Sequence, residues 1–185
     1  MTQAPGPRDP GPAAVDPREF RDTVGRFPTG VAIVTCRTAE GEDVGMTMSS
    51  FSSVSLEPPL VLFSVDCRAY SLSAWEQADA YGINVLAEGQ HELSNRFARP
   101  LGEKWEGVSV QRGIHGVPLI DGAIAQLECV PYAQYDGGDH SIFVARVVRL
   151  RQANRADPLV FALGRYNHLR PGPLGPPDWP LPIHY

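Results

Sequence analysis

The sequence has little of what marks disulfide-linked, nucleic-acid-binding or membrane-spanning proteins. Its 185 residues include 3 cysteines, with no CxxC pair and no short Cys/His spacing typical of a metal site. The formal net charge is −5, which disfavours a broad basic surface for nucleic acid. No apolar run approaches the length of a membrane span, and the first residues lack a signal-peptide pattern. These absences predict a soluble, cytoplasmic protein without a metal site.

The three cysteines also argue against a disulfide framework. Their number is odd, and Cys36, Cys67 and Cys129 are widely spaced. Scattered, unpaired cysteines are typical of proteins from a reducing compartment. Each is expected to be buried, because an unpaired cysteine usually behaves as a small hydrophobic side chain.

Proline and glycine are concentrated at the two ends of the chain. Residues 1–15 and 170–185 are rich in both, and the first segment has hardly any large apolar side chain, whereas the second keeps Trp179, Ile183 and Tyr185. Such segments bury too little surface to offset their chain entropy, which predicts extended or disordered tails. Residues 16–169 are then the folded part, and their length suits one domain with a substantial core.

The folded part opens with a strong helix start. Residues 16–19, Asp-Pro-Arg-Glu, combine an Asp N-cap, a Pro at the first helical position and a Glu three residues after the cap. Phe20, Val24 and Phe27 follow at spacings of four and three, which places them on one helical face. The pattern predicts an amphipathic helix.

The rest of the domain is dominated by strand patterns. The run 59–66 is apolar enough to be expected buried on both faces. Many strands, few helices and no regular βαβ alternation predict a mainly β fold, a barrel with appended helices rather than a Rossmann sheet. Strands are predicted over 31–36, 44–54, 59–66, 81–86, 124–135, 141–150 and 159–163, the second of them running into a loop, and helices over 71–78 and 88–98.

One stretch is unusually rich in hydroxyl groups. Six of the nine residues from Thr47 to Ser55 are Ser or Thr, and none is charged. Short neutral donors of this kind suit a planar ligand with polar edges and a phosphate. A strand end whose serines bond to their own backbone fits the composition equally well. Both interpretations stay open on composition alone.

Six separated motifs, in order, resemble the short-chain flavin reductase family. These proteins are the reductase components of two-component flavin-dependent monooxygenases. The resemblance covers about residues 17–169. Its motifs are the segments 25–31, 46–59, 84–86, 96–98, 138–140 and 164–166.

The resemblance implies an FMN-binding split β-barrel with Greek-key topology, assembled as a homodimer. In the family, the hydroxyl-rich segment wraps the isoalloxazine ring, and a turn after the third strand holds the ribityl phosphate. The chain departs from the family with Ser49 in place of Asn and Ala69 in place of a hydroxyl residue. The implied flavin-site residues are Thr29, Thr47, Met48, Ser49, Ser50, Ser53, Val54, Ser55, Ala69, Tyr70, Ser71, Phe97, Ala98, Lys104, Arg165 and Tyr166.

His140, in a Gly-Asp-His segment, resembles the family's nicotinamide-site histidine. By itself the segment is more typical of a plain hairpin turn. The resemblance favours a histidine that hydrogen-bonds or orients the nicotinamide.

The implied activity is hydride transfer from NADH to FAD or FMN, with free reduced flavin passed to a partner monooxygenase. NADH is favoured over NADPH because no Arg or Lys cluster for a 2′-phosphate is evident. Stacking two rings about 3–3.5 Å apart and excluding water is sufficient for this chemistry. Two alternatives remain: a flavoprotein that retains its flavin and oxidises a substrate itself, and a non-catalytic flavin carrier.

Overall fold

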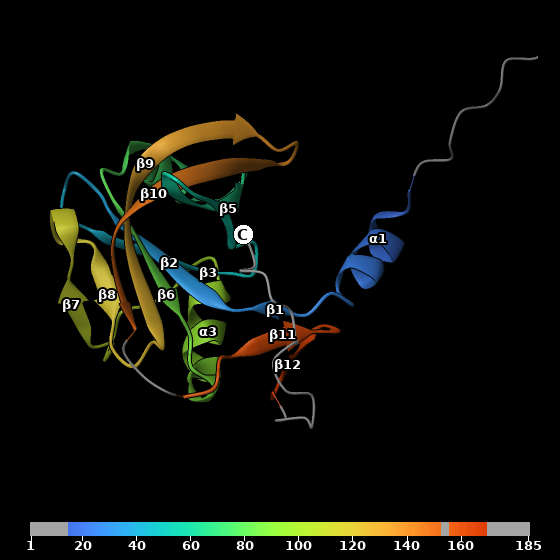
Figure 1. Ribbon diagram of the computed structural model, residues 1–185. Coiled ribbons are helices and arrows are strands. Elements are labelled where there is room, and N and C mark those ends of the chain that lie inside the picture. Colours follow the sequence, from blue (N-terminus) through green and yellow to red (C-terminus); the bar gives the residue numbers. More distant parts are fainter. Residues whose placement is uncertain (1–14, 153–155, 170–185) are drawn as a thin grey trace, which may run out of the picture.

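The computed structural model describes residues 15–152 and 156–169, and these form a mainly β domain (Figure 1). Its centre is a seven-stranded antiparallel sheet in the order β3-β2-β6-β9-β10-β5-β4. The predicted tails lie outside the described residues, except for Val15. The strands of this sheet are β2 Ala32–Arg37, β3 Asp43–Met48, β4 Ser52–Leu56, β5 Pro59–Asp66, β6 Tyr81–Val85, β9 Ala125–Asp136 and β10 His140–Gln152.

Two small sheets and short helices complete the described chain. The first sheet pairs β1 with β11 and β11 with β12, and the second pairs β7 with β8. None of the helices in the described ranges is long and apolar enough to cross a membrane. The bounds are β1 Thr29–Gly30, β7 Val110–Arg112, β8 Pro118–Ile120, β11 Val160–Ala162, β12 Arg165–Asn167, α1 Pro17–Val24, α2 Leu72–Gln77, α3 His91–Ala98, η1 Glu88–Gln90 and η2 Ile114–Gly116.

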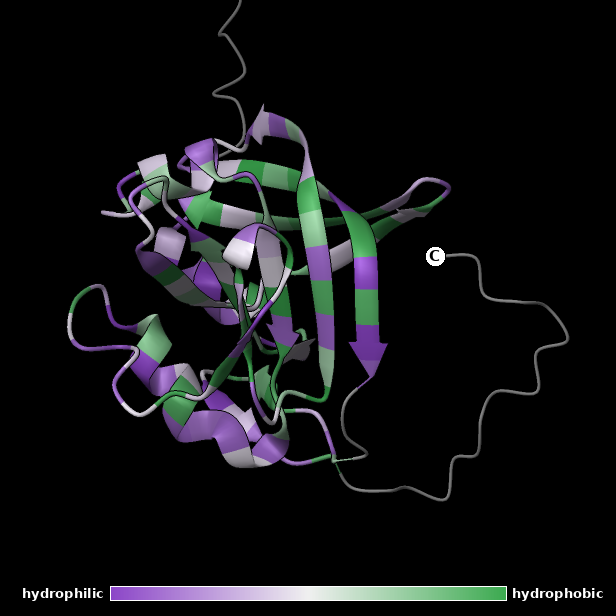
Figure 2. Ribbon diagram, turned by 90° about the vertical axis from the view of Figure 1, so that its left-hand side faces the viewer, coloured by the Kyte–Doolittle hydropathy of each residue, from purple (hydrophilic) through white to green (hydrophobic). Residues whose placement is uncertain are grey.

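The large sheet curves strongly, and the long β9–β10 hairpin arches over one end of it (Figure 1). Hydrophobic and hydrophilic residues alternate along its long strands (Figure 2). Its two edges are β3 and β4, which are consecutive in the chain yet not hydrogen-bonded to each other. The predicted mainly β, antiparallel class is therefore confirmed. The pairings among the described strands leave the sheet open between these two edges.

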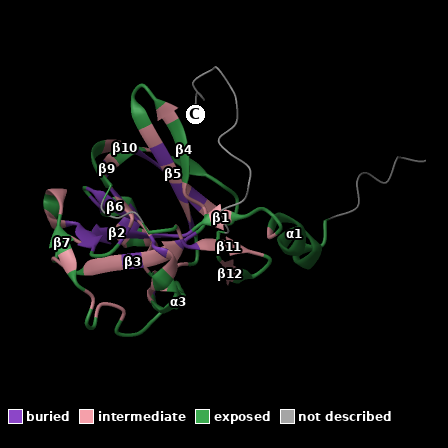
Figure 3. Ribbon diagram, turned by 60° about the horizontal axis from the view of Figure 1, so that its bottom comes forward, coloured by how far each residue is buried: buried purple, intermediate pink, exposed green. Residues whose placement is uncertain are grey.

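The main core lies inside the curve of this sheet. Phe63 stacks on Phe143 with ring centroids 5.2 Å apart and meets Tyr81 edge-on at 5.1 Å. Trp75 of α2 is fully buried beside them, and the buried residues gather on the inner strands (Figure 3). The prediction that β5 is buried on both faces is wrong. Its burial alternates, because one face of the strand packs into the core and the other remains partly exposed.

Helix α1 begins as predicted but does not join the core. The Asp16 carboxylate accepts hydrogen bonds from the backbone N–H groups of Arg18 and Glu19, both at 2.9 Å. None of the helix residues is buried, and the helix projects from the body of the domain (Figures 1 and 3). Phe20 is 60% exposed and Phe27, beyond the helix end, is 74% exposed. The apolar face thus exists but has no cover within the described chain.

Three other expectations needed correction. The strand predicted over 44–54 is two strands, because the chain leaves β3 at Met48 and starts β4 at Ser52. The short strands β7, β8 and β12 were not predicted, since they carry too few residues for a periodic pattern. Cys36 and Cys129 are buried as expected, whereas Cys67 is exposed at the end of β5.

Candidate functional site

A cavity of about 710 Å³ lies at one edge of the large sheet, beside β3. Its walls come from β3, the turn between β5 and α2, the end of α3, and the loop after α3. It brings together seven residues predicted for the flavin site: Thr47, Ala69, Tyr70, Ser71, Phe97, Ala98 and Lys104.

The inner wall depends on a glycine in β3. A Cβ placed on Gly45 would come within 2.6 Å of the Phe97 ring and 3.0 Å of the Trp105 ring. Those two rings meet edge-on with centroids 4.8 Å apart. The Trp105 indole N–H also donates to the carbonyl oxygen of Asp43 at 2.9 Å. The absence of a side chain at residue 45 therefore lets two aromatic rings close against β3.

Lys104 supplies a cation to this wall. Its Nζ lies 3.4 Å from the carbonyl oxygens of Gly45 and Phe97, and no carboxylate pairs with it among the described residues. Burial lowers the pKa of this ammonium group from its usual 10.5. A half-buried cation held only by neutral carbonyls is well suited to an anionic ligand.

The opposite wall is a tightly fixed turn after β5. The Asp66 carboxylate accepts hydrogen bonds from the Arg68 guanidinium at 2.8 and 3.1 Å and from the Arg68 backbone N–H at 2.8 Å. These bonds, the side-chain ones first, hold the pKa of Asp66 well below its usual range. Ser71 accepts a bond from the Trp75 indole N–H at 3.1 Å, so its hydroxyl hydrogen can still donate to a ligand.

Two of the cavity's three acidic side chains pair with arginines, and the third, Glu42, is exposed and has no ion pair among the described residues. Asp66 pairs with Arg68, and Asp43 pairs with Arg112 at 2.6 and 2.8 Å. Both aspartates line the cavity. Their pairing reduces the repulsion that an incoming phosphate would meet there.

His140 lies in a neighbouring hollow of about 500 Å³, not in the same cavity. It opens β10 opposite Asp66 of β5, and its Nδ1 lies 2.6 Å from a carboxylate oxygen of Asp139. That contact orients the ring and leaves Nε2 for another partner. Cys67 lines this hollow while Asp66 lines the large cavity, so the two sites adjoin across one turn.

In the hydroxyl-rich segment 47–55, some side chains bond to the protein backbone and others have hydroxyl groups available for a ligand. The Thr47 hydroxyl donates to the Ser94 carbonyl at 2.7 Å, and the Ser64 N–H donates to the Ser50 hydroxyl at 3.0 Å. These two side chains bond to the protein backbone. Ser49, Ser53 and Ser55 have no side-chain hydrogen bond to another described residue, and Ser49 and Ser53 are exposed.

The other predicted flavin-site residues lie away from the cavity. Met48 is buried in the core, and its neighbour Met46 lines the cavity instead. Val54 is exposed on the edge strand β4, where a register shift separates Ser53 from Ser55.

Thr29, Arg165 and Tyr166 belong to the small three-stranded sheet. The Tyr166 hydroxyl bonds to the Ser94 hydroxyl at 2.8 Å and to the Asn95 amide oxygen at 3.0 Å, which fixes this sheet against α3. Thr29 lies in β1 beside Phe161, and Arg165 is exposed in β12.

The sequence did not identify several residues of the cavity wall. Gly45 and Met46 directly precede Thr47, and the loop Arg99–Gly102 lies between Ala98 and Lys104, which were both predicted. Their position next to or between predicted residues was the only sign in the sequence that they belong to the cavity wall. Trp105 directly follows the predicted Lys104, and Asp43 is added through its contact with Trp105, which the sequence does not reveal.

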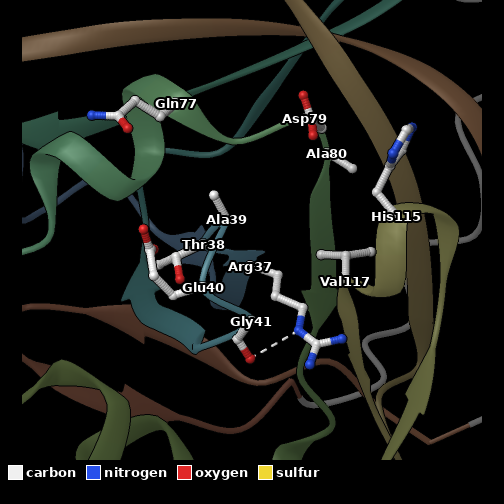
Figure 4. A pocket seen from close by; sticks show the side chains of 10 residues that line it. All are labelled: Arg37, Thr38, Ala39, Glu40, Gly41, Gln77, Asp79, Ala80, His115 and Val117. Carbon is white, nitrogen blue, oxygen red and sulfur yellow. Dashed lines mark hydrogen bonds between the residues drawn. The ribbon is translucent and has the colours of Figure 1, made fainter.

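A separate cavity of about 410 Å³ lies beside the β2–β3 turn (Figure 4). Figure 4 shows Arg37 bonded to the Gly41 carbonyl, at 3.0 Å, with His115 on the far side of the hollow. None of the residues predicted for the flavin or nicotinamide site lines it. The large cavity is therefore the one that the sequence motifs identify.

Known proteins match this chain over nearly its whole length. The model of the flavin reductase like domain family matches residues 24–170. The FMN reductase (NADH) SmoA of Agrobacterium fabrum is 42% identical over 156 residues, covering 84% of this chain and 87% of that protein. The reductase subunit HsaB of a flavin-dependent monooxygenase of Rhodococcus jostii is 35% identical over 179 residues, covering 97% and 91%.

Solved structures agree with the sequence relatives. The NADH:FAD oxidoreductase SgcE6 of Streptomyces globisporus, in complex with NAD and FAD fragments, superposes with a TM-score of 0.80. It shares 36% identity, and the match covers 88% of this chain and 99% of that chain. With the fold, the motif order and the matched length in agreement, this chain belongs to the flavin reductase like domain family.

Proposed function

We propose that this chain is an NADH-dependent flavin reductase that supplies reduced FMN or FAD to a separate monooxygenase. The observation that carries the proposal is the cavity beside β3, which gathers seven of the sixteen predicted flavin-site residues in a chain of this family. Relatives named as NADH-dependent flavin reductase and as a monooxygenase reductase subunit support both halves of the proposal.

The cavity fits a flavin in size and chemistry. Its volume of about 710 Å³ lies within the usual range for ligand pockets, about 300–1,000 Å³. Met46 and Trp105 supply an apolar wall backed by the fully buried Phe97, while Lys104 and Ser71 supply donors for a phosphate. A mainly apolar site with a few convergent polar groups is what an aromatic ring with one anionic arm requires.

Each group then has a distinct task. Bound flavin supplies the hydride acceptor. Lys104 and Ser71 hold the phosphate, and the β3 wall positions the ring. His140, oriented by Asp139, binds the nicotinamide through Nε2 from the adjoining hollow.

The serines of the edge strand have a second proposed role. Ser49, Ser53, Val54 and Ser55 lie at the open edge between β3 and β4. We place them against the outer face of the flavin ring, which would use the hydroxyl groups that have no protein partner. Thr29, Arg165 and Tyr166 would close the pocket from the small sheet.

The proposed functional unit is a homodimer of split β-barrels in the cytoplasm, with residues 16–169 as the catalytic domain. Uncovered apolar side chains on α1 support the dimer. The unpaired cysteines support the compartment.

The test is NADH oxidation by the purified protein with FMN, FAD or no added flavin. Oxidation that saturates with added flavin is expected, and the protein should lose flavin during gel filtration. Flavin that stays bound through gel filtration would instead favour a flavoprotein acting on its own substrate. Flavin binding without NADH oxidation would favour a carrier.

A further inference from the structure

Tyr70 occupies an unusual place at the mouth of the large cavity. It is 91% exposed, the highest value among the exposed large hydrophobic residues of the described chain, yet it lines the cavity. Single exposed aromatic residues on a protein surface need no explanation. An exposed aromatic ring at the mouth of a cavity is a different case, because it can stack on the part of a bound ligand that extends out of the cavity.

The backbone that carries Tyr70 is held firmly. The N–H of Ala69 donates to the Asp66 carbonyl at 2.8 Å, and the N–H of Leu72 donates to the Ala69 carbonyl at 3.0 Å. The bidentate Arg68–Asp66 pair braces the same turn. The ring is therefore presented from a fixed turn, which reduces the entropy lost when a ligand stacks on it.

The cavity offers a second cation further along its lining. Lys104 is half-buried against β3, whereas Arg99 is exposed in the loop after α3. Among the described residues Arg99 has no ion pair. Leu101, 69% exposed, adds apolar surface to the same loop.

The cavity lining thus includes a half-buried lysine, an exposed arginine and an exposed aromatic ring. FMN ends at one phosphate, which Lys104 and Ser71 can satisfy. FAD continues with a second phosphate and an adenine. Every base has a π-face that can stack on an aromatic side chain. The two exposed groups match the part of FAD that FMN lacks.

We propose that Tyr70 makes this site selective for FAD over FMN by stacking on the adenine, with Arg99 at the second phosphate. The proposal rests on the proposed flavin reductase function and names the flavin that the same site takes. Tyr70 is a specificity-determining residue in this scheme, and it takes no part in hydride transfer.

The test compares dissociation constants for FAD and FMN in the native chain, Tyr70→Ala and Tyr70→Phe. The native chain should bind FAD more tightly than FMN. Tyr70→Ala should weaken FAD roughly tenfold, within the range for losing one base–aromatic stack, and leave FMN within about twofold. Tyr70→Phe keeps the ring and should keep FAD affinity. Tyr132→Ala, at an exposed tyrosine of β9 outside the cavity, is the matched control.

Three outcomes would overturn the proposal. FAD affinity could be unchanged in Tyr70→Ala, both flavins could weaken equally, or the NADH KM alone could rise. In each case NADH oxidation by the native chain with FMN would show that the reductase function still stands. A native chain that binds neither flavin would overturn both.

Discussion

At the scale of single residues, His140 is the clearest test of nicotinamide binding. His140→Ala removes one oriented hydrogen-bonding group from the hollow beside the flavin cavity. We expect the NADH KM to rise about tenfold, since a hydrogen bond of this kind contributes about 1 kcal/mol or somewhat more. Flavin Kd should change less than about twofold, because the side chain lies outside that cavity. Steady-state kinetics and flavin titration measure the two.

His91→Ala is the matched control, at an exposed histidine of α3 outside both hollows. It should leave both constants unchanged. A collapse of flavin affinity in His140→Ala, with an unchanged NADH KM, would contradict the proposed role.

Titration of the Lys104 ammonium group should make flavin affinity depend on pH. In the proposed site its charge binds the flavin phosphate, and burial lowers its pKa from 10.5. As the pH rises through this lowered pKa, the ammonium group loses its proton and the flavin Kd should increase. This increase should begin at a lower pH than it would if the phosphate were bound by an exposed lysine. Flavin titrations between about pH 7 and pH 10 measure the effect.

Lys104→Arg separates this effect from titration of the flavin itself. A guanidinium stays charged throughout that range. The variant should therefore bind flavin with a flatter pH profile, whereas Lys104→Gln should bind about tenfold more weakly even at neutral pH. Identical profiles for the native chain and Lys104→Arg would exclude Lys104 as the source.

At the scale of elements, the fit between β3 and α3 depends on Gly45. Gly45→Ala places a methyl group against the Phe97 and Trp105 rings, with separations below normal contact. We expect a loss of about 1–3 kcal/mol in the free energy of unfolding and weaker flavin binding, because the inner wall must move. Urea unfolding and flavin titration measure the two quantities.

Gly89→Ala provides the comparison, since a Cβ at residue 89 meets no atom within 4 Å. It should change stability by no more than about 0.5 kcal/mol. Equal effects at both glycines would mean that the wall tolerates the methyl group.

The elements that were predicted correctly share a physical reason. The helix at residue 17 is encoded by its Asp cap, and the β9–β10 hairpin by long strands around a glycine pair. The break between β3 and β4 was not predicted. Ser49 to Phe51 continue a strand-like pattern, and only the separation of the two sheet edges reveals the loop.

At the scale of the whole molecule, the exposed apolar face of α1 leads us to expect a homodimer. The helix has eight residues, none of them buried. Helices shorter than about 12–15 residues are marginal in water without packing. Its exposed apolar residues Phe20 and Val24, with Phe27 beyond its end, therefore suit a second copy of the chain as the covering surface.

Light scattering should give a mass twice the 20.1 kDa of one chain. Phe20→Glu places a charge in the apolar face and should shift the protein toward the monomer. Arg18→Gln changes the net charge by the same amount on the opposite face and should leave the dimer intact. A native chain that is monomeric at all concentrations would contradict the proposed homodimer.

The sequence by itself determined the mainly β class, most strand positions and the family, because these depend on local periodicity, turn chemistry and motif order. It also predicted Thr47, the turn 69–71, Phe97, Ala98 and Lys104 as flavin-site residues, and these line one cavity in the structure. Only the tertiary structure decided that Met46 rather than Met48 lines the cavity, and that His140 lies in a separate hollow. Strand pairing and register set those positions, and both arise from contacts between residues far apart in the chain.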